Sequence, residues 1–125
     1  HADPNINYLN IHIWPYNWSW VKADSLKELL PCAKENTKKY IDDHMVIARK
    51  YSKPIVLEEF GFPRDGFSFS KEAPTTARDE YYRYVFDLIR QDRESGGLLP
   101  DKIPTMYSGK REMTIPVTRL KNNKD

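Results

Sequence analysis

Two adjacent glutamates, Glu58 and Glu59, end a short apolar stretch and are the first candidates for nucleophilic or acid–base chemistry. Residues 55–57 are Ile-Val-Leu after a Lys-Pro pair, a pattern typical of a strand buried on both faces of a parallel sheet. A carboxylate directly after such a strand occupies the place where α/β barrels keep their catalytic groups. The alternative is that both glutamates are a solvated strand end without chemistry.

A second segment with a similar pattern, a strand that ends in polar and aromatic residues, precedes residues 55–59 in the chain. Residues 8–13 suit a strand, and Pro15 ends that strand because proline cannot donate to a sheet ladder. His12 and Trp14 are two positions apart, so we expect their side chains on the same side of the sheet. The strand is therefore predicted to end with polar and aromatic groups that face one way.

Further aromatic residues follow on the loop after this strand: Tyr16, Trp18 and Trp20. Aromatic faces stack on the apolar faces of pyranose rings, while imidazole and indole N–H groups supply hydrogen bonds. A lone histidine on a strand is more often a core residue than a catalytic one. His12 with these aromatic neighbours favours a sugar-binding surface.

Two motifs resemble a known enzyme family. Residues 11–18 (Ile-His-Ile-Trp-Pro-Tyr-Asn-Trp) and 56–64 (Val-Leu-Glu-Glu-Phe-Gly-Phe-Pro-Arg) resemble the sixth and seventh strands of glycoside hydrolase family 5, and look closest to its endo-β-1,4-mannanases. The resemblance covers roughly residues 1–97 and implies a (β/α)8 barrel and a retaining mechanism. It also implies that the nucleophile is Glu59, the glutamate directly before the aromatic-glycine pair.

The resemblance implies roles for the remaining candidates. The sixth strand of the family usually ends His-x-Tyr, and this chain has His12 with Trp14 in the tyrosine's place. His12 would orient the catalytic carboxylates, and Trp14 would donate to Glu59 or line the cleft. Sugar contacts are expected from Tyr16, Trp18 and Trp20. Arg64 is expected either to pair with Asp65 in its loop or to contact the nucleophile or the sugar.

The second catalytic carboxylate is missing. Retaining glycosidases need two carboxyl groups about 5–5.5 Å apart, and the family places its acid/base in an Asn-Glu-Pro motif. This chain contains no Asn-Glu pair. Glu58 is not expected to replace it, because successive side chains of a strand point to opposite faces. A barrel needs about 250 residues and this chain has 125, so we expect a C-terminal half-barrel that is inactive alone.

Helices are expected between and after the two strands. Residues 24–30 begin with a Ser25–Glu28 capping box, Pro31 marks a break, and a helix over 37–50 has its apolar stripe at 3.6-residue spacing. A second helix is predicted over 77–94, with Thr76 as its N-cap and Gly96-Gly97 after its end. The fold class is therefore α/β: about two βα units of a partial (β/α)8 TIM barrel.

The chain is predicted to divide near residue 100. Residues 1–99 would form the barrel part, and residues 100–125 an atypical, partly disordered tail. The family's eighth strand ends in a tryptophan that forms the floor of a sugar subsite, and the tail has none. Residues 103–107 are interrupted by Pro104, and a short edge strand is expected over 114–117, again broken by proline.

Composition excludes several classes of function. With a net charge of +2 and mixed signs throughout, no basic patch favours nucleic acid, and no apolar run could span a membrane. Cys32 is the single cysteine, and no His/Cys cluster predicts a metal or cofactor. The expected partner is β-mannan or a related polysaccharide. By resemblance, the parent enzyme would be secreted or periplasmic.

Two alternatives remain from the sequence. One is an endo-β-1,4-glucanase of the same family. The other is a non-catalytic half-barrel that binds sugar weakly or only self-associates. Self-association of the isolated chain is expected in either case, because missing neighbours leave strand edges unpaired.

Overall fold

The computed structural model describes residues 2–96, 106–108 and 111–113. Its elements are β1 (Leu9–Ile13), α1 (Leu30–Tyr51), β2 (Ile55–Phe60), the 3-10 turn η1 (Asp65–Phe67), α2 (Thr76–Glu94), β3 (Met106–Ser108) and β4 (Arg111–Met113). The predicted order of strand, helix, strand, helix is confirmed for the first two βα units.

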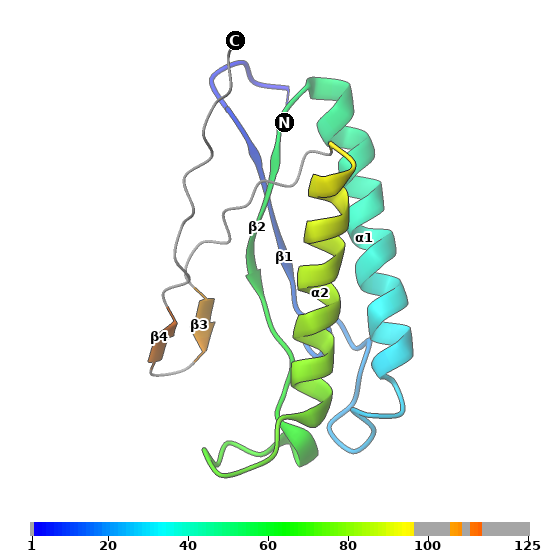
Figure 1. Cartoon of the computed structure of the whole chain (residues 1–125), viewed down its shortest axis with the longest axis vertical. Coiled ribbons are helices and arrows are strands. Elements are labelled where there is room, and N and C mark those ends of the chain that lie inside the picture. The colour runs from blue at the N-terminus through cyan, green and yellow to red at the C-terminus, as the bar shows by residue number, and fades with distance from the viewer. Residues whose placement is uncertain (1, 97–105, 109–110, 114–125) are drawn as a thin grey trace.

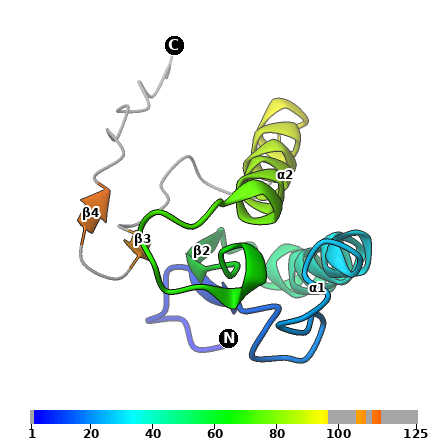
Figure 2. The same cartoon turned by 90° about the horizontal axis from the view of Figure 1, so that it is seen from below.

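Strands β1 and β2 run parallel and side by side, with α1 and α2 on one side of them (Figures 1 and 2). The strand residues that face the helices are fully buried: Leu9, Ile11, Ile13, Ile55, Leu57 and Phe60. The other face has exposed Asn10 and half-buried His12 and Val56. The prediction of strands buried on both faces is therefore wrong for the described residues, because both helices cover the same face.

Helix α1 begins seven residues before the predicted start at Thr37. Pro31 lies in the first turn, where a helical N–H has no partner in any case, so it starts the helix rather than breaking it. The predicted capping box is absent, since the Ser25 hydroxyl donates to Asp24 and residues 26–29 form turns. The predicted apolar stripe is confirmed.

Helix α2 matches its predicted range to within one residue, but Thr75 rather than Thr76 is the N-cap. The cap bond comes from elsewhere in the chain, because the Asp65 carboxylate accepts from the Ala77 amide at 3.2 Å. Gly96 follows the helix with a φ of +74°, a conformation in which glycine has no steric penalty. Asp65 thus fixes the loop after β2 to the start of α2.

The two helices are joined by one buried and one exposed polar contact. Thr37 and the Tyr81 hydroxyl hydrogen-bond at 2.7 Å in the core, and Lys34 pairs with Glu80 at 2.5 Å nearer the surface. These contacts fix the angle between α1 and α2, and so the position of the strand ends that precede them.

The tail prediction is tested only in part. Strand β3 overlaps residues 103–107, where an interruption by Pro104 was expected, and pairs antiparallel with β4, which the sequence did not predict. The predicted strand at 114–117, most of the predicted disorder and Gly97 lie outside the described residues. Among the described helices, none combines the length and the apolar character needed to cross a membrane.

Candidate active site

A β-bulge lies at the carboxyl end of the sheet. Ile11 pairs with Leu57, but His12 pairs with Glu59, so Glu58 is an extra residue in β2. An extra residue interrupts the strict alternation of side chains and re-aims those around it. The candidate catalytic glutamates stand at this irregularity.

The bulge places both glutamates beside one histidine. Leu57 and Phe60 are both buried against the helices with two residues between them instead of one, so Glu58 and Glu59 share the opposite face. His12 Nε2 lies 3.3 Å from Glu58 Oε2, and His12 Nδ1 lies 3.5 Å from Glu59 Oε2. The prediction that the two carboxylates point to opposite faces is wrong, because the bulge breaks the period of two.

The two carboxylates have different surroundings. Glu58 Oε2 also accepts a hydrogen bond from Asn10 Nδ2 at 2.8 Å, and its side chain is 30% exposed against 56% for Glu59. The hydrogen bonds from Asn10 and then from His12 hold the pKa of Glu58 below its ordinary value. The Glu58 carboxylate is therefore held in its ionised form by its two hydrogen-bond donors.

Trp14 lies over the chain just after Glu59. A Cβ added to Gly61 would overlap the six-membered ring of the indole, so only glycine allows this close contact. No hydrogen bond from the Trp14 indole reaches Glu59 among the described residues. Trp14 instead forms one wall of a pocket, and its expected role in lining the catalytic cleft stays a prediction.

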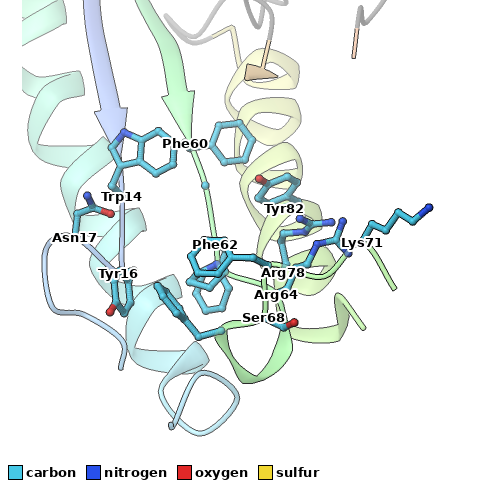
Figure 3. A pocket seen from close by; sticks show the side chains of 14 residues that line it. Trp14, Tyr16, Asn17, Phe60, Phe62, Arg64, Ser68, Lys71, Arg78 and Tyr82 are labelled. Carbon is cyan, nitrogen blue, oxygen red and sulfur yellow. The ribbon is translucent and has the colours of Figure 1, made fainter. Parts of the chain in front are cut away.

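The pocket lies between the loops that follow β1 and β2 and has a volume of about 480 Å³ (Figure 3). Three of the predicted sugar-contact residues line it: Trp14, Tyr16 and Arg64. Tyr16 stacks against Phe67 with ring centroids 4.3 Å apart. Pockets of this size that combine aromatic walls with a few polar groups are typical of small-ligand sites.

The other two predicted tryptophans lie elsewhere. Trp18 and Trp20 pack edge to face at 4.9 Å, and Trp18 also contacts Tyr40 of α1 at 5.0 Å. They form an aromatic cluster against the helix and do not line the pocket. Trp18 is still 37% exposed, so it offers a surface next to the pocket rather than inside it.

Arg64 does not form the predicted loop ion pair. Its Nη1 donates to the Ala73 carbonyl at 3.0 Å, and Asp65 is occupied at the start of α2. The guanidinium is therefore held at the pocket wall, and its expected contact with the nucleophile or with sugar stays a prediction.

Sequence reasoning missed several residues of this region: Asn10, Asn17, Phe67, Arg78 and Tyr82. The spacing of Ile55, Leu57 and Phe60 departs from a period of two, and this signal could have indicated the bulge. Arg78 and Tyr82 are four apart on α2 and therefore share a helix face, but nothing in the sequence places that face at the strand ends.

A family model described as GH family 5 beta-mannosidase-like matches residues 1–123. The chain belongs to glycoside hydrolase family 5. This assignment confirms the resemblance inferred from the two strand motifs. No curated protein sequence matches this chain significantly.

Solved structures of a Rhizomucor miehei family 5 mannosidase are similar to this chain. The first has 28% identity and a TM-score of 0.76, and the match covers 92% of this chain and 29% of the mannosidase. A glutamate-to-alanine variant has 28% identity and a TM-score of 0.71 over 76% of this chain and 25% of its own. Another such variant, in complex with mannosyl-fructose, has 30% identity and a TM-score of 0.70 over 74% and 24%.

This family 5 chain thus spans less than a third of the mannosidases that it matches. Within the part that the structure describes, no group of three His, Cys, Asp or Glu side chains is arranged to hold a metal ion.

Proposed function

We propose that this chain supplies the nucleophile part of a retaining glycoside hydrolase that cleaves β-1,4-mannosidic bonds in mannan-type polysaccharides. The observation that supports this most directly is Glu59 at the bulged end of β2, beside His12, in a mannosidase-like family 5 chain. The binding of mannosyl-fructose by a similar enzyme supports a mannose-containing ligand.

Glu59 is the nucleophile in this proposal. Its carboxylate attacks the anomeric carbon while the bond to the leaving sugar breaks, which gives a covalent glycosyl-enzyme that water then hydrolyses. His12 lies 3.5 Å from the carboxylate and limits its orientation. The pocket that begins at Trp14 would hold sugar rings next to this centre.

Glu58 is not the acid/base. A general acid needs a pKa raised toward the working pH, whereas the contacts of Glu58 with Asn10 and His12 lower its pKa. From the sequence, Glu58 is also not expected to be the acid/base, but the reason there is strand alternation, which the bulge interrupts. In the structure the reason is the lowered pKa of Glu58. The proton for the leaving group must come from a carboxyl group elsewhere in the barrel, so the chain by itself is expected to show no family-typical hydrolysis of galactomannan.

The proposal can be tested in a chimera in which residues 1–96 replace the matching segment of the Rhizomucor miehei mannosidase. After reaction with a 2-deoxy-2-fluoro-β-mannosyl fluoride, peptide mapping should find the label on Glu59. E59Q should abolish labelling, and E58Q, the matched control, should retain it. A label on Glu58, or none in a chimera whose circular dichroism shows a folded protein, would contradict the assignment.

A further inference from the structure

The charged residues that line the pocket beside the bulge are all positively charged. None of the residues that line it is acidic, while Arg64, Lys71 and Arg78 all contribute to its wall. Lys71 is largely exposed and has Glu72 at 3.6 Å, so the two arginines are the cations that belong to the pocket itself. A site with positive charge and no carboxylate of its own complements an anionic ligand.

The two guanidinium groups come from different elements and meet at one end of the pocket. Arg64 follows β2 and is held by the Ala73 carbonyl, whereas Arg78 comes from the first turn of α2. Figure 3 shows both beside Tyr82. Burial raises the pKa of the Tyr82 hydroxyl, and the positive charge of Arg78 opposes that rise, as expected for a nearby cation.

No salt bridge within the described residues uses either guanidinium. Both side chains are half-buried. Asp79 also acts on the Tyr82 hydroxyl, but its carboxylate accepts a hydrogen bond from Thr75 and forms no salt bridge with either guanidinium. Two neighbouring cations that form no salt bridge repel each other, and a bound anion would remove that cost. The planar guanidinium also matches a carboxylate in geometry, because it can donate two parallel hydrogen bonds.

The rest of the pocket fits a sugar ring. Trp14 is fixed by its contact with Gly61, and Tyr16 is fixed by stacking on Phe67. Figure 3 places these aromatic side chains and Asn17 away from the arginines, so a ring and an acidic group can be held at the same time. Asn17 adds an amide that can bond sugar hydroxyls.

We propose that this pocket binds a saccharide that carries a carboxylate, a uronic acid residue, with its ring between the aromatic side chains and its carboxylate on Arg78 and Arg64. The inference rests on the proposed function in that the ligand is a sugar. It adds that this pocket, which lies beside the proposed mannan-cleaving centre at Glu59 and is not lined by it, takes an acidic sugar unit in preference to a neutral one.

The test compares two ligands that differ at one carbon: methyl β-D-mannopyranoside and the corresponding methyl β-D-mannopyranosiduronate. NMR titration of the 125-residue chain at neutral pH should show the uronate binding about tenfold more tightly, as a charge-assisted contact predicts. The preference should shrink as salt is added. Sodium acetate, which supplies the charge without the ring, should bind far more weakly than the uronate.

Substitutions of single arginines test whether the preference for the uronate over the neutral glycoside arises in the pocket. R78Q should bring the two affinities to within about twofold of each other, R78K should keep part of the preference, and R83Q, an exposed arginine on the same helix, should keep all of it. Equal binding of the two glycosides by the unaltered chain, absence of binding by both, or acetate binding as tightly as the uronate would each overturn the inference. So would a folded R78Q that retains the preference.

Free D-mannuronate is a further ligand in the NMR titration. Tighter binding of the methyl glycoside indicates a uronic acid within a saccharide chain, and equal binding indicates the free sugar acid; both fit the proposed pocket. Labelling of Glu59 in the chimera uses a neutral sugar and does not depend on this preference. If the uronate test fails, the proposed function is therefore not contradicted. If the labelling fails, a measured preference for the uronate still supports the proposed pocket.

Discussion

At the scale of single residues, the site depends on His12 lying between two carboxylates that are adjacent in the chain. Glu58 is fixed by two hydrogen-bond donors, whereas within the described part of the chain Glu59 has one polar contact, with His12 at 3.5 Å, and is more exposed. One carboxylate is therefore held for structural reasons while its neighbour stays accessible to a ligand. This difference in surroundings, rather than residue type, separates their proposed roles.

Replacing Asn10 tests this difference. N10A removes the largest cause of the lowered pKa, so the pKa of Glu58 should rise toward its ordinary value, measured by NMR titration of the side-chain carboxyl carbon. Because the folded pKa is lowered, Glu58 contributes stability above its unfolded pKa and loses it as pH falls through the folded one. In N10A the contribution of Glu58 to folding stability should therefore be smaller, and as pH falls it should be lost at a higher pH than in the unaltered chain. The helix variant N36A should leave this titration unchanged, and an unchanged pKa in N10A would refute the assignment.

At the scale of elements, the bonds between α1 and α2 set where the strand ends and their loops lie. The Thr37–Tyr81 hydrogen bond is fully buried, and burial raises the pKa of the Tyr81 hydroxyl, so this group stays protonated and can donate. Tyr82 follows it on α2 and lines the pocket. The helix pair therefore connects core packing to the shape of the site.

Removing one partner of this bond should destabilise the fold. Y81F leaves the Thr37 hydroxyl buried without its tyrosine partner, which we expect to cost about 1–3 kcal/mol in urea unfolding. T37V removes the other partner at similar volume. The double variant should cost less than the sum of the two single changes, because it leaves neither group unsatisfied. Strict additivity would show that the contact is absent in solution.

At the scale of the whole molecule, both helices cover the same face of the described β1–β2 sheet. β1 and β2 each have a single hydrogen-bonded strand neighbour among the described residues, and Val56 and His12 are only half-buried on the opposite face. Unpaired strand edges favour pairing with another chain. The family 5 structures that match this chain are more than three times as long.

The isolated chain should therefore self-associate. Light scattering at micromolar concentration should give a mass above the 14.8 kDa of one chain. V56K places a charge on the face opposite the helices and should shift the chain toward monomer. V46K on the exposed surface of α1 serves as the matched control and should not. A monomer at all concentrations in the unaltered chain would exclude this association.

The sequence by itself determined the α/β order, the parallel strand ends that hold His12 and Glu59, the range of α2 and the membership in family 5. These features follow from local periodicity and from two motifs whose residues lie close together along the chain. Only the tertiary structure decided that Glu58 and Glu59 share a face, because the bulge depends on how β2 pairs with β1. It also decided that Trp18 and Trp20 pack on α1 while Arg78 reaches the pocket, because such contacts depend on how helices dock against strand ends, which local sequence does not encode.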